Sequence, residues 1–259
     1  MALSRTEISA LSQRMLRDYD ARTPGSDFAN GLRLSLGEAR QVQNVVTQLR
    51  QQRGETVVGY KIGCVCAENQ KRHGLSHPVW GRLWSTEQHG DNVQLARADY
   101  ATVAIEGEFA VRLKRGIEPF DTSLETIAES VEQILPVIEL HNLVFRGDAP
   151  HGHELIANNA IHAGVVSGLG SNKPASPVTT NLTIQFDGQT VDEWSRILWP
   201  DDLLQAVSWL VSELATHGLE LQPGQTILTG ALGPPLPVTD VKRVQVTSSH
   251  FGSVTAAFF

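Results

Sequence analysis

The sequence predicts an α+β fold, with a helical N-terminal lobe at residues 1–54 followed by a β-rich domain at residues 55–259. Two observations support this class. Apolar side chains in the first segment recur at helical spacing, whereas β-branched and apolar runs dominate from about residue 100 onward. Strands and helices do not alternate strictly, which disfavours a doubly wound parallel sheet. We therefore expect a mixed β-sheet accompanied by a few helices.

Capping signals place the predicted helices. A serine or threonine followed three residues later by glutamate can satisfy the first backbone N–H groups of a helix, and glycine commonly follows its last turn. By these signals we expect helices from Ser35 with Glu38 to Gly54, from Thr122 with Glu125 to about residue 134, around residues 154–162, and from Asp201 to His217-Gly218.

Strands are predicted where β-branched and apolar residues run between turn signals. The pair Asp187-Gly188 suits a type I′ turn, so the residues on its two sides are read as a hairpin. The expected strands cover residues 56–62, 102–113, 137–145, 182–186 with 190–191, 226–228, 241–247 and 253–258.

Composition narrows the class of protein. The net charge of −7 leaves no basic surplus to neutralise the phosphates of a nucleic acid or an anionic membrane surface. No apolar run is long enough for a transmembrane helix, and the first 16 residues mix charged with apolar side chains, unlike a signal peptide. Cys64 and Cys66 are the only cysteines, and we interpret them as packed thiols in a reducing cytoplasm. No glycine-rich phosphate-binding loop occurs at a strand-to-helix turn.

Two carboxylates form the first candidate site. Glu106 and Glu108 are two residues apart in a predicted strand, so both side chains project from the same face. Adjacent anions repel unless solvent screens them or a cation lies between them. The alternative is a solvent-facing strand edge that Arg112 helps to neutralise.

A third carboxylate interrupts another apolar strand. Glu139 and His141 are the polar residues in an otherwise hydrophobic run. A buried carboxylate must be paired, protonated or bound to a metal, because leaving it unpaired costs several kcal/mol. The alternative is an edge strand with one polar face. Together with Glu106 and Glu108, Glu139 would form a hard-cation site that suits Mg²⁺ or Mn²⁺ better than zinc.

Lys61 and two asparagines complete the candidates. Lys61 lies in an apolar strand between two glycines, where burial would lower its proton affinity and suit it to acid–base work. An edge lysine that reaches solvent is the alternative. Asn158 and Asn159 could cap a helix or orient a polar ligand. The nine histidines show no metal-binding pair, so each is interpreted as a surface or packed residue.

These residues lie in segments that together resemble one enzyme family. The chain is similar to the 2-keto-4-pentenoate hydratases and 4-oxalocrotonate decarboxylases of the fumarylacetoacetate hydrolase superfamily, and the matching segments follow the family's order. They are residues 59–63 (GYKIG), 74–83 (GLSHPVWGRL), 106–110 (EGEFA), 137–139 (VIE), 156–160 (IANNA), 227–230 (ILTG) and 251–254 (FGSV).

The resemblance implies a fumarylacetoacetate-hydrolase-like mixed β-sheet roll, a metal held by Glu106, Glu108 and Glu139, and an active-site lysine at Lys61. It also implies a homo-oligomer and a role in aromatic catabolism. Three departures stand out. Val79 replaces the acidic residue after the family's proline, and Gly107 replaces the proline between the two metal carboxylates. Residues 157–161 lack the family's Asp and Ser.

The expected activity is that of a divalent-metal-dependent lyase on small 2-oxo acids. The substrate would chelate the metal through its carboxylate and 2-oxygen, and the metal would stabilise the enolate. Lys61 would move a proton while a 2-hydroxy-2,4-dienoate ketonises and then adds water. A 4-oxalocrotonate-type decarboxylase uses the same enolate, and a divergent or non-catalytic relative is a further alternative. The family's departures leave the substrate open.

Overall fold

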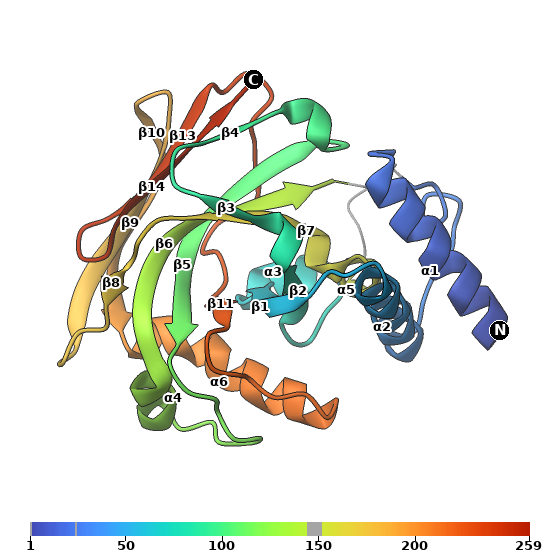
Figure 1. Ribbon diagram of the computed structural model, residues 1–259, viewed down its shortest axis with the longest axis horizontal. Helices are drawn as coiled ribbons and strands as arrows, with labels where there is room; N and C mark the ends of the chain where they lie inside the picture. Colours follow the sequence, from blue (N-terminus) through green and yellow to red (C-terminus); the bar gives the residue numbers. More distant parts are fainter. Residues whose placement is uncertain (1, 24, 144–151) are drawn as a thin grey trace.

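The computed structural model describes residues 2–23, 25–143 and 152–259, and its strands form two sheets that pack against each other (Figure 1). In the first sheet the order is β2 (Val79–Trp84), β1 (Val57–Gly63), β11 (Thr226–Leu228), β5 (Val103–Leu113), β6 (Val131–Asn142), β7 (His162–Ser167) and β3 (Gln88–Gly90), with β12 (Leu236–Pro237) on β5 and β8 (Ser171–Asn172) on β6. The second has the order β10 (Gln189–Trp199), β9 (Val178–Phe186), β13 (Arg243–Ser248), β14 (Gly252–Phe258) and β4 (Val93–Leu95).

The main core lies between the sheets. Because side chains alternate along a strand, one face of β5 and β6 presents Ile105 and Ile138 to the second sheet, where Ile184 and Val246 are equally buried. Gly107 allows a close approach of the two sheets, since a Cβ at this position would lie 2.7 Å from Ile184. The opposite face of the same two strands therefore points away from this core.

Helices cover the sheets on two sides (Figure 1). The described helices are α1 (Arg5–Asp20), α2 (Leu36–Gln52), α3 (Ala67–Arg72), α4 (Leu124–Ser130), α5 (Gly152–Ala157), α6 (Asp201–Thr216) and the 3₁₀ turns η1 (Ser85–Glu87), η2 (Arg97–Asp99) and η3 (Asn159–Ile161). Both α1 and α2 begin with a complete capping box. Their apolar faces form one buried cluster with Val79, Ile156 and Ala160. The division into a lobe at residues 1–54 and a domain at residues 55–259 stays a prediction.

The predicted fold class is confirmed, as are the strand at residues 226–228 and the hairpin. Asp187 and Gly188 both adopt positive φ, as a type I′ turn requires. The predicted helix from Thr122 to about residue 134 is wrong. Ser123 caps a helix that ends at Ser130, and the residues beyond it pair with the whole length of β5. No helix in the described part of the chain is long and apolar enough to cross a membrane.

Gly59 should tolerate no side chain. A Cβ there would lie 1.8 Å from the backbone oxygen of Thr226 on the neighbouring strand, and backbone cannot move aside as a side chain can. We expect Gly59→Ala to lower the free energy of unfolding by about 3 kcal/mol or more. Gly90→Ala is the control, because nothing lies within 4 Å of its added Cβ. Chemical denaturation measures both, and equal stability of the two variants would contradict this interpretation.

Candidate functional site

Three carboxylates share the face of β5 and β6 that points away from the core. Glu106 on β5 pairs directly with Glu139 on β6, and Glu108 follows two residues along β5. Glu108 and Glu139 are buried, whereas the Glu106 side chain keeps 12% of its surface exposed. The cross-strand register therefore gathers the three predicted carboxylates in one place.

Lys61 reaches this cluster from β1. Its Nζ lies 3.2 Å from Glu139 Oε1 and 3.5 Å from the carbonyl oxygen of Ala160, and its side chain is 3% exposed. Burial opposes the charged ammonium, but the charges of Glu139, Glu106 and Glu108 outweigh it and raise the pKa of Lys61 to about 12. Burial therefore acts in the expected direction, but the net shift of the Lys61 pKa is the opposite of the one expected, and the side chain is a cation at neutral pH.

Two buried histidines join the cluster. His141 Nε2 lies 2.9 Å from Glu106 Oε2 and 3.7 Å from Glu139 Oε2, and His162 Nδ1 lies 2.8 Å from Glu139 Oε1. Sequence reasoning assigned the histidines to packing or to the surface. The signal for His141 was present, because it stands two residues from Glu139 and shares its face by the alternation that linked Glu106 to Glu108.

The pKa values of the two fully buried carboxylates are shifted in opposite directions. Burial raises the pKa of Glu108 well above its usual range, and the charge of Glu139 adds to this effect. Burial also opposes ionisation of Glu139, but Lys61, His141 and His162 outweigh it and hold the pKa of Glu139 well below its usual range. The surroundings of Glu139 thus favour its ionised form, whereas those of Glu108 oppose ionisation.

The donor atoms fit a hard divalent cation. Among the described residues Glu108 Oε1, Glu139 Oε2 and His141 Nδ1 are buried without a hydrogen-bond partner, whereas the other Glu108 oxygen accepts from the Gly230 N–H at 2.6 Å. Glu106, Glu139 and His141 each offer a ligand atom, and these atoms lie within 4.8 Å of one another. Unpartnered buried oxygens are costly unless a cation binds them. This group shares two residues with the predicted ligand set, which stays a prediction.

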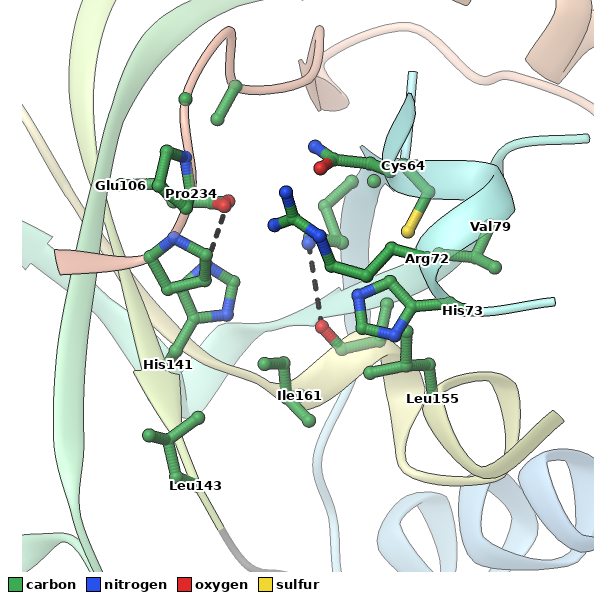
Figure 2. Close-up of a pocket in the computed structure, with 17 residues that line it drawn as sticks. Cys64, Arg72, His73, Val79, Glu106, His141, Leu143, Leu155, Ile161 and Pro234 are labelled. Atoms are coloured by element: carbon green, nitrogen blue, oxygen red, sulfur yellow. Dashed lines mark hydrogen bonds and ion pairs between the residues drawn. The ribbon is translucent and has the colours of Figure 1, made fainter. Parts of the chain in front are cut away.

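A cavity of about 190 Å³ opens onto this cluster (Figure 2). Its lining includes the buried Lys61, His141 and Ala160 and the partly buried Glu106 and Ile161. The remaining lining combines apolar with polar side chains and comprises Gly63, Cys64, Asn69, Arg72, His73, Val79, Leu143, Leu155, Ala231, Gly233, Pro234 and Pro235. A small organic acid is the kind of ligand that such a cavity fits.

Asn158 and Asn159 lie outside this lining. Asn159 Oδ1 accepts from the Arg82 N–H at 2.7 Å and its Nδ2 donates to the Arg82 carbonyl at 2.9 Å, so the side chain ties η3 to β2. Asn158 donates to the Glu154 carbonyl and lines a separate cavity of about 40 Å³. Their predicted contact with substrate has no geometric support here and stays a prediction.

The segment of these asparagines still shapes the cavity. Asn159, Ala160 and Ile161 follow one another with positive φ, which is uncommon for residues with a side chain. The Asn159–Arg82 hydrogen bonds hold one end of this backbone, and its carbonyl at Ala160 faces Lys61. Such strain is typical of functional sites. The sequence showed the asparagines, but the contact with Arg82 is separated by 77 positions and carries no local signal.

The comparisons with known proteins support the same family. No protein-family model matches this chain. It is 27% identical over 221 residues to a 2-keto-4-pentenoate hydratase of Burkholderia vietnamiensis, covering 84% of each chain. It is 26% identical over 250 residues to a 4-oxalocrotonate decarboxylase of a Pseudomonas species, covering 96% of this chain and 97% of the relative. The resemblance seen in the sequence is confirmed.

Solved structures confirm the fold. The 4-oxalocrotonate decarboxylase from Pseudomonas putida G7, complexed with magnesium and adipate, superimposes with a TM-score of 0.90 at 20% identity and covers 100% of this chain and 99% of its own. A putative fumarylacetoacetate isomerase/hydrolase from Oleispira antarctica has a TM-score of 0.53 at 17% identity, covering 78% and 94%. The predicted fumarylacetoacetate-hydrolase-like architecture is therefore present.

The Cys64 thiol should resist alkylation at neutral pH. Cys64 lines the cavity half-buried, and burial raises its pKa to about 11. Because the thiolate is the nucleophile, its reaction with iodoacetamide should rise about tenfold per pH unit from neutrality until the pH approaches that pKa. Peptide mass spectrometry after timed alkylation measures this, with the exposed Cys66 as internal reference. Faster labelling of Cys64 than of Cys66 at about pH 7 would contradict this assignment.

Proposed function

We propose that this chain, a relative of the 2-keto-4-pentenoate hydratases and 4-oxalocrotonate decarboxylases, is a divalent-metal-dependent lyase that hydrates a 2-hydroxy-2,4-dienoate. The observation that carries this proposal is a charged Lys61 at 3.2 Å from Glu139, at the end of a cavity where buried carboxylate oxygens have no partner. The hydratase and decarboxylase names of the relatives support the choice of substrate class.

Glu106, Glu108 and Glu139 are the proposed ligands of Mg²⁺ or Mn²⁺, with His141 as a neighbour able to join them. A bound divalent cation supplies Lewis acidity toward the carboxylate and 2-oxygen of a 2-oxo acid. The similar decarboxylase structure that holds magnesium supports a hard cation. His162 positions Glu139 through its 2.8 Å contact, as partners of metal-binding side chains commonly do.

Lys61 is the proposed proton carrier. During ketonisation the 2-hydroxyl of the dienol loses a proton and C5 gains one, and water then adds with its hydroxyl on C4 and its proton on C3. Without a bound cation the three carboxylates raise the pKa of Lys61 to about 12, and the protonated Lys61 is the proposed general acid. The low exposure of its side chain, 3%, limits exchange of that proton with solvent. The product is a 4-hydroxy-2-oxo acid.

Decarboxylation of a 4-oxalocrotonate-type acid is the second candidate. The observation that favours it is Val79, which lines the cavity as a buried apolar side chain where an acidic residue is typical of the family. An apolar wall offers no group to activate water, and it favours conversion of a charged carboxylate to neutral CO₂. We further propose a cytoplasmic homo-oligomer that acts in aromatic catabolism, as the resemblance implies.

The direct test follows 2-hydroxypenta-2,4-dienoate by NMR with the protein and Mg²⁺. We expect 4-hydroxy-2-oxopentanoate to form, and EDTA to abolish its formation, because ion removal leaves the substrate's carboxylate and 2-oxygen unbound. Turnover that EDTA does not affect contradicts the metal-dependent mechanism. Conversion of 2-oxohex-3-enedioate alone would establish the decarboxylase, and binding without conversion of either acid would indicate a non-catalytic relative.

Two variants should separate metal binding from proton transfer. Glu106→Ala removes a proposed ligand, so we expect weaker Mn²⁺ binding by calorimetry and loss of metal-dependent turnover. Lys61→Met should keep Mn²⁺ affinity nearly intact and slow turnover by about 10²-fold or more, because it removes the acid but no ligand. Full activity of Glu106→Ala, or equal effects of both changes on affinity, would contradict the assigned roles. Thermal denaturation checks folding, since Lys61→Met leaves Glu139 without one of its buried partners.

A further inference from the structure

Arg72 occupies a part of the cavity that the proposed chemistry does not use. It is the last residue of α3, the short helix that follows the Lys61 strand, and it lines the same cavity as Lys61 and Glu106. Figure 2 shows its side chain extending from α3 into the cavity, on the side that faces Glu106 and Pro234. The cavity is therefore lined by a second cationic side chain besides Lys61.

The exposed fractions of the Lys61 and Arg72 side chains indicate that the two cations lie at different depths in the cavity. The Lys61 side chain is 3% exposed and that of Glu106 12%, whereas that of Arg72 is 53% exposed. The acidic cluster thus forms the floor, and Arg72 stands at the mouth. The lining also includes Val79 and Leu155, both buried and apolar. A ligand that spans this cavity meets Lys61 and the acidic cluster at one end and the Arg72 cation at the other, with apolar side chains in the lining.

The Arg72 guanidinium has donors to spare. Its Nη2 contacts Glu68 Oε1 at 3.1 Å, four residues earlier on α3, and the Glu68 side chain is 82% exposed. An exposed pair at this spacing is weak, because solvent screens both charges. The guanidinium carries five N–H donors in a planar fork that matches a carboxylate. Binding a ligand carboxylate therefore requires little to be broken.

We propose that Arg72 is a specificity-determining residue that binds the distal carboxylate of a dicarboxylic substrate, a 2-oxo or 2-hydroxydienoic acid with a carboxylate at each end. This inference rests on the proposed function, because that function places the 2-oxo end at the floor. The two ends of the substrate then have different surroundings. The 2-oxo end lies beside Lys61 and the acidic cluster, and the distal carboxylate pairs with Arg72 at the mouth of the cavity. With a monocarboxylic dienoate bound, the Arg72 guanidinium would interact only with Glu68 and water.

The proposal also favours one reaction over the other. Decarboxylation removes the charge of the distal carboxylate as CO₂, so a cation that stabilises this carboxylate raises the barrier. Hydration leaves the distal carboxylate unchanged, so the contact with Arg72 persists from substrate to product. A distal carboxylate that is paired with Arg72 therefore stays in the product. We expect the substrate to be a dioate that undergoes hydration.

Calorimetry with two inert acids of equal length tests the binding step in the presence of Mg²⁺. Adipate and hexanoate differ only in that adipate has a carboxylate where hexanoate has a methyl group. We expect the wild-type protein to bind adipate about 10- to 100-fold more tightly than hexanoate, and Arg72→Gln to abolish that preference by weakening adipate alone. Arg72→Lys should keep part of it, because the charge stays and the fork is lost.

Lys71→Gln is the matched control. Lys71 precedes Arg72 on the same helix, is exposed and lies outside the cavity lining, so the substitution removes the same charge from a neighbouring position. We expect it to preserve the preference for adipate. Equal affinity of the wild-type protein for the two acids, or an equal loss in Lys71→Gln and Arg72→Gln, overturns the role of Arg72.

Turnover separates this inference from the proposed function. Among hydratase substrates, 2-oxohept-4-ene-1,7-dioate carries the distal carboxylate and 2-hydroxypenta-2,4-dienoate lacks it. We expect Arg72→Gln to lower kcat/KM for the dioate about 10- to 100-fold and to leave that for the monoacid within about twofold. Equal losses on both substrates overturn the inference alone. Failure of the wild-type protein to convert either acid, with the adipate preference intact, overturns the hydratase function and leaves the distal-carboxylate contact standing.

Discussion

Repulsion among three carboxylates on one face of a strand pair is the constraint on which the rest of the site depends. Glu106, Glu108 and Glu139 can lie together only if positive charge or protons compensate them. Lys61 supplies a buried cation 3.2 Å from Glu139, and burial raises the pKa of Glu108 and so opposes its ionisation. The oxygens that stay unpartnered are the places where a divalent cation would complete the balance. The same three carboxylates that would bind a metal also raise the pKa of Lys61. The proposed metal ligands and the proposed acid therefore depend on each other electrostatically.

The register of the paired strands in the sheet brings these side chains together. β5 and β6 pair along their whole length, which places Glu106 opposite Glu139, while β11 separates β1 from β5 and fixes how far Lys61 must reach. On the reverse face Gly107 lets the second sheet approach closely, so the two carboxylates that flank it belong to a strand packed on both sides. A site on a buried pair of central strands is rigid, because packing on the strands limits their movement. Its geometry is set by the core as much as by its own side chains.

Much of this could be predicted from local pattern, and the rest depends on contacts between distant segments. Alternation along a strand is enough to pair Glu106 with Glu108, and the same rule applied to Glu139 would have included His141. The direction of the Lys61 pKa shift could not follow from its apolar strand, because the opposing carboxylates belong to strands distant in sequence. The tie between Asn159 and Arg82 is equally invisible locally. The helix after Thr122 was extended too far because a capping signal marks where a helix starts and says little about where it ends.

The departures from the family pattern fall along the cavity, where selectivity is decided. Val79 and Ile161 replace polar residues of the family, and both line the cavity, whereas the acidic cluster and Lys61 at the floor are kept. Making the wall more apolar removes groups that could hold a substrate by its middle. Binding then depends on its two ends, one at the floor and the other at Arg72. A ligand that carries a carboxylate at each end satisfies both and lies in a single orientation, with its 2-oxo group next to Lys61.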